Sequence, residues 1–128
     1  QDRWIAHSWL TEDDLNFLYN RALALVYPSS DEGFGIPIVE AARAGCPAIT
    51  IQGAVPPEVN ADPELALAAP QPEAISALLR RLMDPDYRAQ IRQRALNAGA
   101  AASWGGTVKK LMTVYESLGS ERSLKAAR

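Results

Sequence analysis

The sequence is poor in the residues that mark several functional classes. Its 128 residues include one cysteine, Cys46, so no internal disulfide can form and nothing requires an oxidising compartment. Thirteen Lys and Arg side chains stand against fifteen Asp and Glu, which disfavours a nucleic-acid partner, since phosphates select clustered positive charge. No apolar run approaches the length of a membrane span, and no signal-peptide pattern opens the chain. We therefore predict a cytoplasmic protein, and contact of the full-length protein with the cytoplasmic face of a membrane stays open.

The composition is otherwise that of an ordinary globular domain, with 48% hydrophobic residues. A chain of this size buries about two-thirds of its unfolded surface, which is enough for a real core. We expect one domain over residues 1–128. Because the sequence starts at Gln1 without an initiator Met, we also expect it to be an excerpt of a longer protein.

The N-terminal third begins with a strand candidate at residues 3–7. Thr11 and Asp14 form a capping-box pattern that predicts the start of a helix. The short, continuously apolar run 22–27 is typical of a strand covered on both faces, as in a parallel sheet, and Pro28 ends it. The stripe of the helix that we expect to be buried consists of Leu15, Leu18, Tyr19 and Ala22.

A second helix and strand follow the run 22–27. Pro37 suits the first turn of a helix that continues to about Ala44, and Gly45 is placed as its C-terminal stop. Residues 47–51 are the next strand candidate. The order strand, helix, strand is a βαβ unit, and it predicts a Rossmann-like three-layer α/β domain with a parallel sheet.

Three further helices are expected in the C-terminal half, after a weaker apolar stretch at residues 65–68. The first follows Pro70 and runs through about Met83, and the second starts at Asp84 and Pro85 and ends near Gly99. Ser103 starts the last, whose tail beyond Gly119 we expect to fray. Its predicted apolar face consists of Val108, Leu111, Met112 and Tyr115.

The stretch from Glu32 to Glu40, EGFGIPIVE, lies between the predicted strand and helix. In open parallel sheets ligands bind at this place, beyond the carboxyl end of a strand. The first backbone N–H groups of the helix have no partner within it and lie at the positive end of its dipole, so they are an anion site suited to phosphate. These donors would be Gly33, Phe34, Gly35 and Ile36. The alternative is that the glycines only satisfy the dihedral angles of the turn.

Two carboxylates flank the predicted anion site. Glu40 lies one helical turn beyond Ile36, so its side chain leans back toward the loop and could accept hydrogen bonds from the hydroxyls of a ribose. Glu32 could do the same for a sugar ring. The pair suits a ligand with polyol, diphosphate and polyol in series, which is the outline of a nucleotide-sugar. Alternatively, Glu32 is simply solvated and Glu40 only favours the first turn of its helix.

The segment PSSDEGFGIPIVEAARAGCPAI, residues 28–49, resembles the nucleotide-sugar-binding segment of family 4 glycosyltransferases. The shared pattern is Pro-Ser, then Glu-Gly-Phe-Gly, then a second Glu. Seven residues separate the two glutamates, Glu32 and Glu40. Ala42, Ala44, Gly45 and Pro47, which read Ala-x-Ala-Gly-x-Pro, also match, as does Pro57-Glu58-Val59 after the next strand. The helix with Leu15 and Tyr19 looks like the family's Leu-x-x-Leu-Tyr element.

The resemblance implies the C-terminal, donor-binding domain of a GT-B fold and a hexosyltransferase-type enzyme. Glu32 would be the catalytic candidate, contacting the hydroxyls of the donor sugar, and Glu40 would bind the ribose of the nucleotide. The amides of Gly33, Phe34 and Gly35 would meet the sugar, and Ile36 the diphosphate. Transfer in this family usually retains anomeric configuration and needs neither a bound metal nor a cofactor. The implied partner within the enzyme is an N-terminal acceptor-binding domain.

The chain also departs from the family pattern. The family's basic pair for the diphosphate, an Arg and a Lys, lies upstream of the residues present, as do two strands that would separate residues 3–7 from 22–27. We expect either an excerpt of a complete enzyme or a chain that pairs its strands differently or borrows strands from a partner. As an isolated chain it is expected to be inactive, because no acceptor site is present.

Two other functional classes stay open on this sequence. One is a non-catalytic nucleotide-sugar-binding or scaffolding domain, and the other is a sugar phosphorylase or nucleotide-sugar epimerase. His7 is read as a packed or surface residue, Trp104 as a packing residue, and Cys46 as a small buried hydrophobe. The basic stretch, read as solvated helix faces, consists of Arg80, Arg81, Arg88, Arg92 and Arg94.

Overall fold

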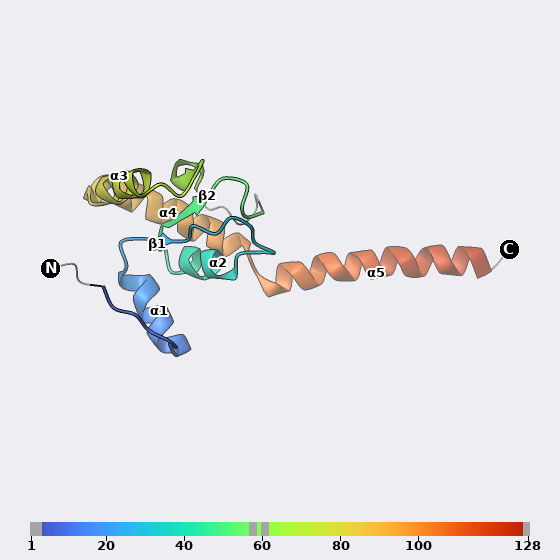
Figure 1. The fold of residues 1–128 in the computed structure, drawn as a ribbon. Coiled ribbons are helices and arrows are strands. Elements are labelled where there is room, and N and C mark those ends of the chain that lie inside the picture. The colour runs from blue at the N-terminus through green and yellow to red at the C-terminus, as the bar shows by residue number, and fades with distance from the viewer. Residues whose placement is uncertain (1–3, 57–58, 60–61, 127–128) are drawn as a thin grey trace.

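The computed structural model describes residues 4–56, 59 and 62–126. Figure 1 shows a small body from which one long helix extends. The elements in chain order are α1 (Glu12–Arg21), β1 (Leu25–Val26), α2 (Ile36–Arg43), β2 (Ala48–Ile51), the 3-10 helix η1 (Pro63–Leu65), β3 (Ala66–Leu67), α3 (Pro72–Leu82), α4 (Pro85–Ala101) and α5 (Trp104–Ala126). The predicted elements from residue 11 to residue 101 are therefore present, with β1 shorter than expected.

The three strands form one parallel sheet in the order β1-β2-β3. Leu25 pairs with Ala48 across the first ladder, and Thr50 pairs with Ala66 across the second. Helix α2 connects β1 and β2, so the βαβ unit and the α/β class predicted from the sequence are confirmed. The carboxyl end of β1 thus leads into the loop that contains Glu32.

The core lies on both faces of β2. Ala48 belongs to a buried cluster with Ile38 of α2, whereas Ile49 belongs to a cluster with Leu82 of α3 and Ile91 of α4. Because successive side chains of a strand point to opposite faces, these two clusters cover the two sides of the sheet. Helix α2, which carries half of the candidate site, is therefore anchored directly on the central strand.

Helix α2 also packs closely against α4. A Cβ atom added at Gly99 would lie 2.6 Å from the backbone nitrogen of Arg43, so only glycine permits this helix crossing. The C-terminal end of α2 is closed as predicted. Gly45 adopts a φ of 70° and donates to the Ala42 carbonyl at 2.9 Å, and Cys46 donates to Ala41 at 2.7 Å. This is the Schellman pattern of hydrogen bonds.

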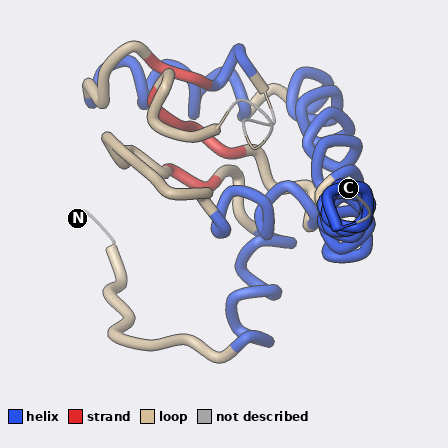
Figure 2. Tube along the Cα trace, turned by 90° about the vertical axis from the view of Figure 1, so that its right-hand side faces the viewer, coloured by secondary structure: helices blue, strands red, loops and turns tan. Residues whose placement is uncertain are grey.

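The start of α1 is also as predicted, but its neighbours are not. Thr11 and Asp14 form the capping box, and Asp14 N donates to Thr11 Oγ1 at 3.0 Å. The strand predicted at residues 3–7 is absent from residues 4–7, and Trp4 and Ile5 are exposed. Figure 2 shows this segment away from the strands. A strand needs a neighbour for its N–H and C=O groups, and the described sheet offers none there.

Three predictions of burial are also wrong. Strand β1 is not covered on both faces, because Val26 is 38% exposed. In the predicted stripe of α1 only Tyr19 is buried, and Leu18 is 42% exposed. Helix α5 extends away from the body, so Trp104 is 85% exposed rather than packed. The predicted apolar face of α5 is exposed as well, at Val108, Leu111, Met112 and Tyr115. Helix α5 also continues past Gly119, where fraying was expected.

Candidate functional site

The loop between β1 and α2 turns at Gly35, which is the N-cap residue of α2. Its φ is 83°, in the left-handed region that L side chains rarely adopt. The residue is buried, and a Cβ atom there would lie 3.2 Å from Ile38 Cδ1 and 3.3 Å from Val55 Cγ1. Gly33 differs, since its φ is not positive and nothing lies within 4 Å of a Cβ built there. Gly35 therefore has a structural requirement, and Gly33 has open space.

The N-terminus of α2 has free hydrogen-bond donors. No side chain caps the helix, and Pro37 occupies its first turn. Among the described residues, the backbone N–H groups of Gly33, Phe34, Gly35 and Ile36 donate no hydrogen bond. Phe34 and Ile36 are also exposed. The four amides are therefore unpaired in the described structure, and the anion site predicted there stays a prediction that rests on the positive end of the helix dipole.

Glu32 is held by a tyrosine at the end of β1. The Tyr27 hydroxyl donates to Glu32 Oε1 at 2.8 Å. Hydrogen bonding from the Ser29 and Tyr27 hydroxyls holds the pKa of the Glu32 carboxyl below its usual value. The Ser29 hydroxyl also lies 3.1 Å from the Asp31 carbonyl oxygen, so its single proton can serve only one of these acceptors. Glu32 is therefore a charged hydrogen-bond acceptor at neutral pH.

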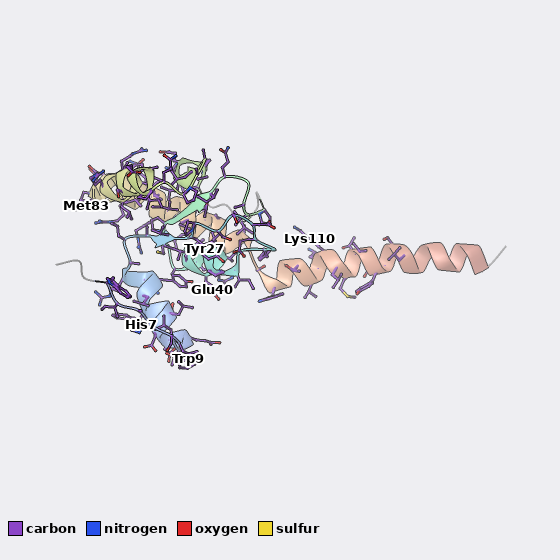
Figure 3. All side chains as sticks on the ribbon, viewed as in Figure 1. His7, Trp9, Tyr27, Glu40, Met83 and Lys110 are labelled. Atoms are coloured by element: carbon purple, nitrogen blue, oxygen red, sulfur yellow. The ribbon has the colours of Figure 1, made fainter. Side chains whose placement is uncertain are left out.

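Glu40 is exposed on α2 and contacts α1. The Tyr19 hydroxyl of α1 lies 3.4 Å from Glu40 Oε2 and donates to it. Burial, followed by the Glu40 charge, raises the pKa of Tyr19 to about 12, so the hydroxyl keeps its proton. Figure 3 shows Glu40 in the body of the molecule, whereas His7 and Trp9 lie on the segment beside α1.

Glu40 lines two hollows, one on either side of α2. The first, of about 620 Å³, lies between α1 and α2 and includes Asn16 and Tyr19. The second, of about 490 Å³, lies between the start of α2 and the start of α5 and includes Phe34 and Trp104. Glu32 lines neither hollow. The structure thus brings Phe34, Ile36 and Glu40 together around one hollow and places Glu32 outside it.

The two tyrosines behind the carboxylates are the residues that sequence reasoning missed. Tyr19 was assigned only to a buried helix stripe, and Tyr27 only to a strand. No local signal links Tyr19 to Glu40, because the two are 21 residues apart and on different helices. Tyr27 and Glu32 are five residues apart, but that spacing has no meaning across a strand–loop junction.

The basic stretch is only partly a solvated face. Arg94 contacts the carboxylates of buried Asp62 at 3.0 Å and of Glu64 at 2.9 Å, and Arg81 contacts Glu64 at 3.2 Å. Tyr87 also donates to Glu64, at 3.2 Å. These contacts tie α3 and α4 to the η1 segment, so the Arg81 and Arg94 side chains have structural partners.

The remaining features of the chain concern Cys46, the Pro57-Glu58-Val59 match, metal ligands and membrane spans. Cys46 is buried as predicted, and burial raises the pKa of its thiol. Pro57 and Glu58 of the Pro57-Glu58-Val59 match lie outside the described residues, and Val59 is buried in the α2 cluster. Within the described part of the chain, no group of three histidine, cysteine, aspartate or glutamate side chains could hold a metal ion. No helix there has the length and apolar content to span a bilayer.

Comparison with known proteins places the chain in a family of sugar-transferring enzymes. Residues 1–98 match the family described as glycosyl transferases group 1, and the chain belongs to that family. No solved structure matches it significantly.

Several curated proteins are similar to the chain. O-antigen chain mannosyltransferase B of Escherichia coli is 33% identical over 120 residues, which are 92% of this chain and 32% of that protein. D-inositol 3-phosphate glycosyltransferase of Nocardiopsis dassonvillei is 28% identical over 120 residues, 91% of this chain and 28% of that protein. O-antigen chain mannosyltransferase RfbU of Salmonella typhimurium is 57% identical over 37 residues, 29% of this chain and 10% of that protein. The chain spans less than a third of the length of these relatives.

Proposed function

We propose that this chain is the donor-binding part of a nucleotide-sugar-dependent glycosyltransferase of the hexosyltransferase type. The observation that carries the proposal is the cradle of free N–H groups at residues 33–36, with an acceptor carboxylate before it and another one turn into α2. Membership of glycosyl transferases group 1 supports it. So do the names of the relatives, which are mannosyltransferases and an inositol phosphate glycosyltransferase.

Each part of the cradle has a role in this proposal. The amides of Gly33, Phe34 and Gly35 face the sugar and that of Ile36 the diphosphate, where fixed dipoles stabilise the charge that develops on the leaving group. Glu40, beside the hollow of α2 and α5, accepts from the hydroxyls of the ribose. Glu32, lowered in pKa, accepts from the hydroxyls of the donor sugar and is the catalytic candidate. A glycosidase acid would need a raised pKa, so its lowered pKa argues against that role.

The finer assignment follows the motif. We propose family 4, with this chain in the C-terminal domain of a GT-B architecture, and transfer with retention of configuration without a bound metal. The acceptor site, the basic residues for the diphosphate and the strands beside β1 would then lie in parts of the protein outside these 128 residues. The exposure of Val26 at the sheet edge is consistent with such a neighbour.

Thermal denaturation of the protein with nucleoside diphosphates and their sugars tests the proposal. A ligand at a hundred times its Kd stabilises the folded state by about 2.7 kcal/mol. We expect one base to raise Tm and its sugar derivative to raise Tm further. If no nucleotide in a panel of uridine, guanosine, adenosine and cytidine diphosphates shifts Tm, the proposal is wrong.

Two substitutions separate the roles of the carboxylates. Glu40→Ala should weaken nucleotide binding and, in the full-length enzyme, abolish nearly all transfer, while Tm without ligand stays unchanged because Glu40 is exposed. Glu32→Ala should weaken binding of the sugar derivative more than that of the free diphosphate. Unaltered turnover by the Glu40 variant would remove that residue from the site. Binding without transfer by the full-length protein would instead favour a non-catalytic binding domain.

A further inference from the structure

Each of the two carboxylates that flank the amide cradle receives an O–H hydrogen bond from a tyrosine. Tyr27, just after β1, donates to Glu32 at 2.8 Å. Tyr19, in α1, donates to Glu40 at 3.4 Å. The two tyrosines come from different elements, and neither is part of the Glu32–Glu40 stretch. The two donors therefore come from α1 and from the end of β1, outside the stretch that contains the carboxylates.

The Tyr19 ring is fixed by packing. The side chain is only 9% exposed and forms a buried cluster with Ala41 and Cys46, with Leu15 packed against it. Tyr19 lines the hollow between α1 and α2 together with Glu40, which is exposed. The core therefore sets the position of the Tyr19 hydroxyl. This hydroxyl donates to the carboxylate of Glu40, whose side chain is exposed.

This contact matters because an exposed glutamate has several rotamers. A ligand that needs one of them must select it from the others, and a group that already holds the side chain reduces that entropic cost. The Tyr19 hydroxyl contacts Oε2 of Glu40, and a carboxylate oxygen has further lone pairs. Oε1 and the remaining lone pairs stay available to the hydroxyl groups of a ligand. The same reasoning holds for Glu32, whose Oε1 accepts from Tyr27.

We propose that Tyr19 and Tyr27 are positioning residues, which hold the carboxylates of Glu40 and Glu32 in the orientation that receives the hydroxyl groups of the donor. The inference rests on the proposed function, in which Glu40 binds the ribose and Glu32 the sugar. Tyr19 then serves a part of the ligand that every nucleotide contains, whereas Tyr27 serves only the sugar.

The test is calorimetric titration of the variants Tyr19→Phe and Tyr27→Phe. The probes are uridine, guanosine and adenosine diphosphates and their hexose derivatives, using the base that the wild-type protein binds. Tyr19→Phe should weaken the diphosphate and its sugar derivative alike, by about three- to tenfold. Tyr27→Phe should weaken the sugar derivative by a similar factor and leave the diphosphate within about twofold.

A matched control exists in Tyr87, whose hydroxyl also donates to a glutamate, Glu64, at 3.2 Å. That pair lies between α4 and η1 and lines neither hollow. Tyr87→Phe removes the same chemical group from the same kind of contact, so it should leave both affinities unchanged. Loss of affinity in this variant would show that hydroxyl removal acts through the fold rather than through the site.

A double-mutant cycle separates positioning from general structure. If Tyr19 acts through Glu40, Tyr19→Phe has no further effect in a Glu40→Ala background, so the two losses are strongly non-additive. A merely structural role gives the same fold-loss in both backgrounds and overturns the inference. Unchanged diphosphate affinity of Tyr19→Phe overturns it as well. If the wild-type protein binds no nucleotide, the proposed function and the inference are both wrong. If the wild-type protein binds and only the Tyr19→Phe results disagree, the inference alone is wrong.

A measurement without ligand keeps the inference testable if Tyr19→Phe does not fold. The ring carbon signal of Tyr19 can be followed by NMR during an alkaline titration of the wild-type protein and of Glu40→Gln. The wild-type hydroxyl should ionise near its pKa of about 12, and Glu40→Gln should lower that value by removing the adjacent charge. An unchanged Tyr19 titration would show that the two side chains do not interact, and the positioning role would fall.

Discussion

The crossing of α2 and α4 offers the sharpest test of the architecture, through the substitution Gly99→Ala. A Cβ atom at this position would lie 2.6 Å from Arg43 N and 2.7 Å from Ala42 C. Ordinary contact begins near 3.4 Å, so the new carbon would sit about 0.8 Å too close to backbone atoms. No rotamer change can relieve this, because the opposing atoms belong to the main chain of α2. The two helices must therefore move apart.

Two effects of opposite sign decide the outcome of Gly99→Ala. Alanine is favoured over glycine inside a helix by about 1 kcal/mol. Overpacking of a close contact costs about 1–3 kcal/mol, and separating the helices also weakens the dispersion contacts of Ala95. We expect the second effect to win, with a loss of about 2 kcal/mol in the free energy of unfolding. In a domain of this size that lowers Tm by on the order of 5–10 °C.

Urea denaturation followed by circular dichroism measures this difference. The matched control is Gly105→Ala in exposed α5, where nothing lies within 4 Å of the new Cβ atom, so stability should stay equal or rise slightly. If Gly99→Ala is as stable as the wild-type protein with an unchanged m-value, the close crossing of α2 and α4 is wrong.

Three further predictions concern the loop, the ion pairs and pH. Gly35→Ala should lower the free energy of unfolding by about 1–2 kcal/mol in urea denaturation, because the φ of Gly35 is 83°. Gly33→Ala should change that free energy by less than about 0.5 kcal/mol but weaken nucleotide binding in a titration. Equal stability of the two variants would contradict the turn geometry. Arg94→Ala leaves the carboxylate of Asp62, which is 2% exposed, without its cation, so we expect a loss of about 1–3 kcal/mol, largely independent of salt; a loss that vanishes in 1 M salt would mean the pair is only superficial. The raised pKa of Tyr19 predicts a contribution to stability that is complete below pH 10, the pKa of the unfolded tyrosine, and is lost as pH rises through about 12. Alkaline denaturation of Tyr19→Phe should therefore begin at higher pH than that of the wild-type protein, and identical curves would contradict this prediction.

The sequence predicts α2 and its ends accurately because their determinants are local. Pro37 in the first turn and Gly45 after the last each have a steric reason that depends only on adjacent residues. The free amides before α2 follow from the same local geometry, since the first N–H groups of any helix have no partner within it. The capping box of Thr11 and Asp14 is equally local.

The failures all concern partners that are distant in the chain. The apolar run at residues 4–7 has strand-like composition, but a strand also requires a neighbour, and sequence composition does not supply one. Val26 is also exposed, and an apolar run does not show which distant elements cover its side chains. The periodic spacing in α5 predicts which apolar side chains share a face, such as Val108 and Leu111, but not that the body leaves them uncovered.

The contacts around Glu40 divide the control of its position among three helices. Helix α4 packs closely on α2 at Gly99, and the Tyr19 hydroxyl of α1 donates to the Glu40 side chain. The start of α5 provides the opposite wall with Trp104, which contributes little to the core because it is exposed. It follows that changes in α4 should alter stability and ligand affinity together. Tyr19→Phe and Trp104→Ala should alter affinity with little effect on the free energy of unfolding, so the two kinds of substitution should separate on a plot of affinity against stability.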